Sequence, residues 1–127
     1  MDYLFLISRI LLGGYFLMSG INHFTKSEMM TGYTASKGFP FPKFAVLGTG
    51  ILLALGGLGI LLGMYVQWAV LALVVFLIPT TFIMHAFWQA TEPNMKMMEM
   101  VQFMKNLALL GAVLAYLFIP LPWPYSF

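Results

Sequence analysis

The 127-residue sequence contains no cysteine and few charged residues, which make up only 8% of the chain. Without cysteine the chain cannot form a disulfide, a thiolate nucleophile, a cysteine-ligated zinc site or an iron–sulfur cluster. A soluble domain carries roughly 25% charged residues. With 61% hydrophobic residues, a water-soluble fold could not cover its surface with polar groups. We therefore expect the lipid bilayer to be the main partner of this surface.

The remaining polar residues exclude or disfavour further classes of function. Six scattered cations form no basic stripe, so no nucleic-acid partner is expected. Two histidines, His23 and His85, are too few for a closed metal site, so no metal is predicted. Copper(I) on the methionine-rich run 95–104 and a two-histidine haem stay open as weaker alternatives. No removable signal peptide is expected, because the first apolar stretch lacks a basic leader and a small-residue cleavage site.

Four apolar stretches are long enough to cross a membrane, which takes about 20 helical residues. Residues 44–91 contain no charge and would extend about 72 Å as one helix, so they must fold back. We place that turn at 63–67 and a kink at Pro79. The polar stretch 92–99 is expected outside the core, and short helical turns are expected around 28–36. The sequence thus predicts one all-α integral membrane domain, 1–127, built as a four-transmembrane-helix bundle with helices at 3–24, 44–63, 67–88 and 101–119.

The distribution of lysines predicts an orientation. All five lysines lie in or next to the segments 25–43 and 89–100, whereas the opposite side carries only Arg9, within a span. The positive-inside rule therefore places these two loops in the cytoplasm and both termini outside a multi-pass protein of the cell membrane.

Arg9 is the most costly residue in any predicted span, at about 2.5–3.5 kcal/mol for an arginine at mid-helix. It shares one helix face with Gly13, Phe16, Gly20 and His23, which follow at spacings of 4, 3, 4 and 3. Two alternatives stay open. Arg9 either snorkels to the near interface or points inward and holds an anionic or carbonyl group.

Several other polar side chains are expected at one membrane face, that of the long loops. They end the first and third helices and begin the fourth, so they form either plain interfacial chemistry or the mouth of a pocket between helices. His85 would suit proton transfer, since an unperturbed histidine titrates near pH 6.5. No catalytic residue is assigned, and the ligand or proton-transfer candidates are Arg9, Asn22, His23, Thr81, His85, Trp88, Lys105 and Asn106.

Small residues mark the helix-packing faces. Gly13 and Gly20 lie on the first helix, and Gly56, Gly59 and Gly63 on the second. Glycines at such spacing let helix backbones approach closely. Packing within the bundle is favoured over a dimer seam, and a homo-oligomer stays open.

Four short motifs carry a resemblance that covers nearly the whole chain. They are Arg9 followed by GINHF at 20–24, GILLG at 59–63, HAFW at 85–88 and FMKNLALLG at 103–111. Together they resemble the DoxX family of small bacterial and archaeal four-helix membrane proteins. The resemblance implies an inner-membrane location and a quinone-side redox role, in keeping with the family's link to a thiosulfate:quinone oxidoreductase system. The chain departs from many relatives at Leu53, where they carry an acid that could pair with Arg9, and at His23, where they carry lysine.

Three functions follow as hypotheses, and whether the chain is an enzyme stays open. The first is a quinone-associated subunit of a membrane redox complex. Its electrons would come from a bound cofactor or a redox partner subunit, because no intrinsic cofactor is evident. The second is a non-enzymatic assembly or interaction factor, with the small-residue face of the second helix and the methionine-rich run as its contacts. The third is small-solute permeation.

Overall fold

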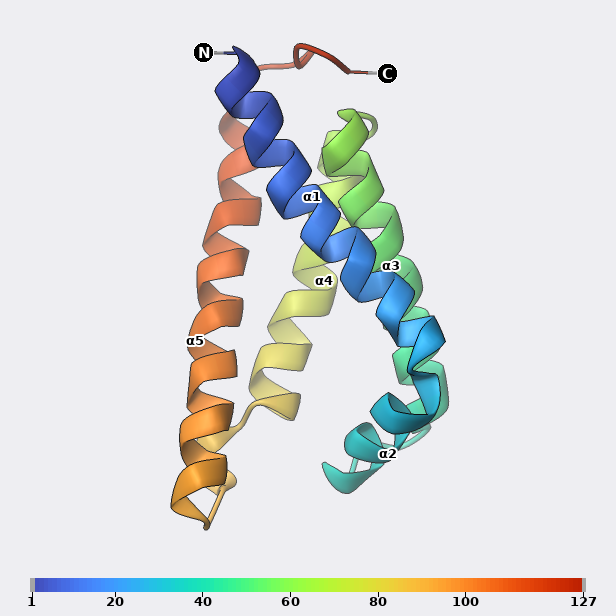
Figure 1. Ribbon diagram of the computed structural model, residues 1–127, viewed down its shortest axis with the longest axis vertical. Coiled ribbons are helices and arrows are strands. Elements are labelled where there is room, and N and C mark those ends of the chain that lie inside the picture. The colour runs from blue at the N-terminus through green and yellow to red at the C-terminus, as the bar shows by residue number, and fades with distance from the viewer. Residues whose placement is uncertain (1, 127) are drawn as a thin grey trace.

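The structure is a computed structural model and describes residues 2–126. Four long helices, α1 (Asp2–Thr25), α3 (Pro42–Leu62), α4 (Val66–Met84) and α5 (Pro93–Ala115), dominate the fold (Figure 1). Three short helices, α2 (Ser27–Ser36), η1 (Phe87–Gln89) and η2 (Tyr116–Phe118), complete it, and no strand occurs within 2–126. Each long helix is apolar and long enough to cross a membrane. This confirms the predicted all-α fold with four spans.

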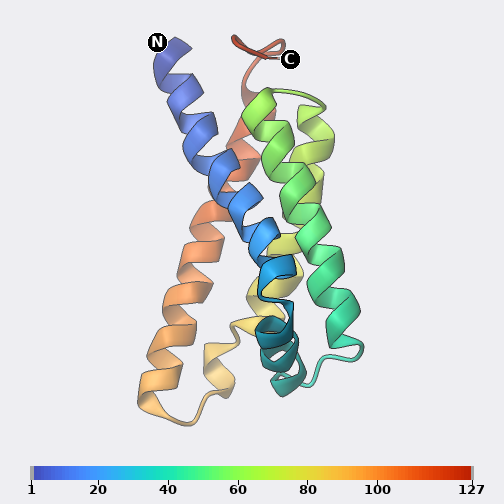
Figure 2. The ribbon, with the colours of Figure 1, turned by 45° about the vertical axis from the view of Figure 1, so that its right-hand side comes forward.

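The long helices pack in the series α1–α3–α4–α5. α1 crosses obliquely over the bundle, whereas α5 diverges from it toward the end where α2 lies (Figures 1 and 2). Both ends of the chain lie at the opposite end of the bundle. This arrangement matches the expectation that the segments containing α2 and η1 share one membrane face.

Glycines set the closest helix contact, between α1 and α3. A Cβ at Gly20 would lie 2.6 Å from the backbone nitrogen of Ala54, and a Cβ at Gly13 would lie 2.8 Å from the carbonyl oxygen of Gly57. Both distances are shorter than any side chain tolerates. The two backbones are therefore in direct contact, as close helix crossings in membranes require.

The second set of glycines faces α4 and the turn that follows α3. A Cβ at Gly56 or at Gly59 would lie 2.6 Å from the side chain of Leu73 or Ala69, respectively. Gly63 ends α3 with a φ of 70°, a left-handed conformation that costs glycine little. These glycines serve packing inside one chain.

Two helix boundaries differ from those predicted. The fourth helix begins at Pro93 rather than at 101, because proline is well suited to the first helical turn and the helix continues through 94–100. Glu99, at the end of the polar stretch 92–99, is only 4% exposed because other parts of the chain cover it. The third helix ends at Met84 rather than at 88, and Trp88 belongs to η1.

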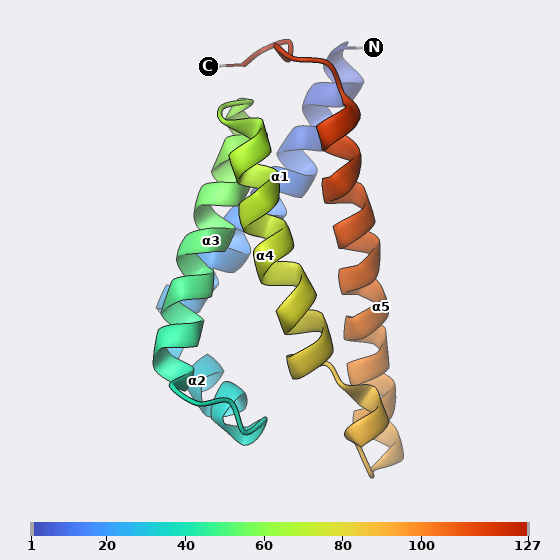
Figure 3. The same ribbon diagram turned by 180° about the vertical axis from the view of Figure 1, so that it is seen from behind.

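The hydrophobic core fills the half of the bundle nearer the α3–α4 turn. It combines the second half of α3, the first two-thirds of α4 and the end of α5, with Phe16 and Leu53 at its inner limit. Beyond these residues α3 and α4 separate toward the α2 end (Figure 3). The candidate site lies there.

Candidate functional site

A cavity of about 360 Å³ lies between the helices at the α2 end. Sites for small molecules typically measure about 300–1,000 Å³ and are apolar with a few polar groups. All five α-helices contribute to its wall, which is mostly apolar. The polar residues that line it are Tyr15, Ser19, Asn22, His23, Tyr33, Thr34, Thr49, Thr80, His85, Gln102, Lys105 and Asn106.

One polar group of the cavity is built by α1 and α3 around His23. The Nδ1 atom of His23 lies 2.9 Å from the carbonyl oxygen of Val46 and 3.1 Å from the hydroxyl of Thr49. Because a carbonyl oxygen only accepts, Nδ1 is the donor in this contact. Thr49 in turn donates to the carbonyl of Ala45 at 2.6 Å. His23 is thus held in place by α3.

A second polar group centres on Glu99, a buried carboxylate of α5. Lys37 places Nζ 2.6 Å from Oε2, and Tyr33 donates its hydroxyl to Oε1 at 2.8 Å. Burial, and then the hydrogen bond to Glu99, raise the pKa of Tyr33 above its usual value. Tyr33 therefore remains a donor at neutral pH. These contacts attach α2 to α5 across one end of the cavity.

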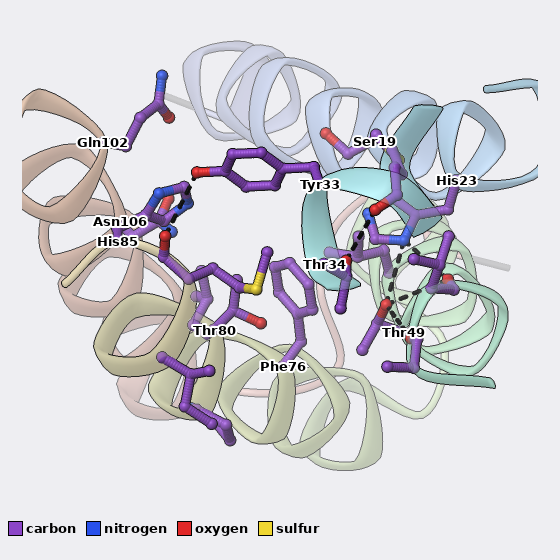
Figure 4. A pocket seen from close by; sticks show the side chains of 18 of the residues that line it. Ser19, His23, Tyr33, Thr34, Thr49, Phe76, Thr80, His85, Gln102 and Asn106 are labelled. Carbon is purple, nitrogen blue, oxygen red and sulfur yellow. Dashed lines mark hydrogen bonds between the residues drawn. The ribbon is translucent and has the colours of Figure 1, made fainter. Parts of the chain in front are cut away.

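His85 joins this group from the end of α4. Its Nδ1 atom lies 3.5 Å from Oε1 of Glu99, is buried and has no hydrogen-bond partner among the described residues. Figure 4 shows His85 and Asn106 at one side of the cavity, His23 and Thr49 at the other, and Phe76 between the two sides. The cavity therefore has hydrogen-bonding groups at two ends and an apolar middle.

Five of the eight candidate residues line this cavity: Asn22, His23, His85, Lys105 and Asn106. Thr81 and Trp88 do not. Thr81 donates to the carbonyl of Leu77 at 2.5 Å, and its neighbour Thr80 reaches the cavity instead. Trp88 packs its ring against those of Phe87 and Phe103, outside the cavity wall.

Arg9 lies at the other end of the bundle and is fully buried. Its guanidinium donates to the carbonyls of Ile60 and Leu61, at 3.2 and 3.0 Å, and to those of Pro124 and Tyr125 in the C-terminal segment. It therefore points inward and holds carbonyl groups, but those of its own chain. Because the last carbonyls of a helix lack partners within the helix, Arg9 joins the end of α3 to the C-terminal segment. No acidic side chain among residues 2–126 forms an ion pair with it. Arg9 is thus not a ligand contact of the cavity.

The sequence reasoning missed Glu99 and its partners in α2. The signal was present, since Glu99, Gln102 and Asn106 follow at spacings of 3 and 4 and so share one helix face. The prediction did not use this face because it began the fourth helix at residue 101, beyond Glu99. Among residues 2–126 no group of three or more His, Cys, Asp or Glu side chains is placed to hold a metal ion.

Comparison with known proteins returned one match. The family model DoxX matches residues 4–86, from the start of α1 to just past the end of α4. No curated protein and no solved structure matched the chain. The matched segment contains Arg9, the glycine faces of α1 and α3, and both histidines of the cavity. Since it spans more than half of the sequence, the chain belongs to the DoxX family.

Proposed function

We propose that this multi-pass membrane protein is a quinone-associated subunit of a membrane redox complex and that its cavity binds the quinone head group. The observation that carries this proposal is the separation of two hydrogen-bonding groups by an apolar middle at Phe76 (Figure 4). A quinone ring is flat and apolar, with carbonyl oxygens at opposite edges. Its shape therefore complements a slot that offers donors at both ends.

The hydrogen-bond donors at the two ends of the cavity belong to different types of side chain. Lys105 and Asn106 of α5 line one end together with His85, which would supply a proton to a reduced quinone oxygen. Ser19 offers a hydroxyl group toward the other end, where the hydroxyl of Thr49 is already donated to the carbonyl of Ala45. The end that holds His85 would therefore be the end of proton exchange.

The electrons must come from outside this chain. The chain has no cysteine and so no iron–sulfur cluster of its own. A redox partner subunit, or a cofactor that it holds, would deliver electrons while this chain positions the quinone. The lysine-bearing segments would face the cytoplasm of a bacterial inner membrane, and the cavity would lie on that side.

Binding of a short-chain ubiquinone analogue to the protein purified in mild detergent tests the proposal. We expect His85→Ala and Lys105→Ala to abolish binding and any quinone-dependent activity, with membrane insertion unchanged. Lys96→Ala is the matched control, because Lys96 is an exposed lysine of the same helix outside the cavity. If both cavity variants bind the analogue as the wild type does, the quinone assignment is wrong.

A second candidate function is assembly or stabilisation of another membrane protein. The exposed methionines of α5, Met97 and Met98 at 63% and Met104 at 60%, favour it, because flexible thioethers adapt to many partner surfaces. A stoichiometric partner in a pull-down, retained after His85→Ala, would support this function. The permeation hypothesis fits less well, since the core around Phe16 and Leu53 fills the bundle beyond the cavity.

A further inference from the structure

The packing of α3 against α4 changes along the two helices. On α3 the residues Ala45, Thr49, Leu52, Gly56 and Gly59 follow at spacings of 4, 3, 4 and 3, so they form one stripe. Gly56 and Gly59 lie against α4, whereas Ala45 and Thr49 line the cavity. The same face of α3 is therefore closed near the turn and open near α2.

α4 shows the matching pattern. Ala69 and Leu73 lie against the glycines of α3, and the next residues of the same stripe, Phe76, Thr80 and Ile83, line the cavity. Ile83 is also 41% exposed. α3 and α4 diverge toward the α2 end, where these residues lie (Figure 3).

A second hollow lies on the outer side of the contact between α3 and α4. It measures about 330 Å³ and is lined by residues of α3, the α3–α4 turn and α4. Ala72 of this groove is one helical turn from Phe76 of the cavity, and Gly56 is less than one turn from Leu53. Its other lining residues are apolar or aromatic: Leu55, Leu58, Gly59, Leu62, Met64, Tyr65, Trp68 and Ala69. We call this hollow the α3–α4 groove.

We propose that the ligand of this protein is a tailed lipid, an isoprenoid quinone, whose head group occupies the cavity and whose tail leaves between α3 and α4 along the α3–α4 groove. This inference rests on the proposed function and adds the class of quinone and its path. Donors line the cavity, whereas carbon atoms dominate the groove wall, so the two hollows match the two parts of such a lipid. The gap between α1 and α5 is the alternative exit. It is less suited to a hydrocarbon chain because Lys105 lies there, 5.8 Å from the ring of Tyr15.

Photolabelling tests the path of the tail. The full chain in mild detergent is incubated with a ubiquinone analogue that carries a diazirine at the end of an isoprenoid tail, irradiated and mapped by mass spectrometry. We expect labels on the groove, at positions such as Leu58 and Trp68, that disappear when unlabelled short-chain quinone competes for the cavity. Labels confined to α1 and α5 would overturn the proposal. An unlabelled groove in a protein that is dimeric in the same detergent would also overturn it, because a second copy would then cover the groove.

A pair of variants adds a matched control. Ala72→Phe fills the α3–α4 groove, whereas Leu71→Phe adds bulk on the same helix at a lipid-facing position, 50% exposed, outside the groove. Groove labelling should be lost in Ala72→Phe and retained in Leu71→Phe, with binding of the tail-less analogue unchanged in both. An unchanged label pattern in Ala72→Phe refutes the path while leaving the proposed function intact. Failure of the wild type to bind either analogue refutes both.

Discussion

Replacement of Arg9 by methionine tests whether its buried guanidinium holds the bundle together. The change keeps the length of the side chain and removes donors to four carbonyl groups, two at the end of α3 and two in the C-terminal segment. It also removes a cation 5.3 Å from the ring of Trp123. Arg9 is fully buried, but three of its four hydrogen bonds are only partly buried, so water can reach some of the carbonyls that it leaves.

The expected loss follows from these contacts. Hydrogen bonds to a charged group contribute about 1.5–3 kcal/mol each, but partial rehydration makes four such losses less than additive. Leaving buried carbonyl groups without a donor costs about 1–3 kcal/mol per group, and removal of a buried charge offsets part of this loss. We expect Arg9→Met to lower the free energy of unfolding by about 1–3 kcal/mol in total. Arg9→Lys should lie between Arg9→Met and the wild type, because an ammonium lacks the planar fork that reaches both segments.

Reversible unfolding by SDS in mixed micelles measures the difference. Lys43→Met is the control, an exposed cation at the start of α3 whose loss should cost no more than about 0.5 kcal/mol. The C-terminal segment should also become more sensitive to protease in Arg9→Met. If the free energy of unfolding of Arg9→Met lies within about 0.5 kcal/mol of the wild type, Arg9 does not stabilise the junction of α3 with the C-terminal segment.

Three further predictions concern packing and the Glu99 cluster. Gly20→Ala should destabilise the protein by about 1–3 kcal/mol by forcing α1 from α3, since its Cβ would lie 2.6 Å from a backbone atom. Gly14→Ala, whose Cβ meets nothing within 4 Å, should instead stabilise the protein by about 0.5–1 kcal/mol. If the two variants change the free energy of unfolding in SDS equally, the close contact of Gly20 with α3 is contradicted. Glu99→Gln should loosen α2, measured as faster amide hydrogen exchange over 27–36, because the ion pair with Lys37 is lost; unchanged exchange would remove Glu99 from that role. Tyr33→Phe should also speed amide exchange over 27–36, but by less, since it loses one hydrogen bond and no charge. Faster exchange in Tyr33→Phe than in Glu99→Gln would contradict this ranking of the two contacts.

The sequence by itself determined the four spans and the all-α membrane fold. Lipid is the solvent of most side chains, so hydropathy and length, which are local properties, decide where the chain crosses. The same reasoning placed Asn22 and His23 at one membrane face with His85, because connectivity alternates the helix ends between the two faces. It also identified the glycines that lie at the contacts of α3 with α1 and α4.

Only the tertiary structure decided what the polar groups contact. Arg9 meets the end of α3 and the C-terminal segment, and Glu99 meets α2, although these partners lie far away in the sequence. Such pairings depend on how far each helix tilts and where α3 and α4 diverge. Tilt is set by the summed packing of side chains from several helices, each contact contributing little, so no local pattern reveals it.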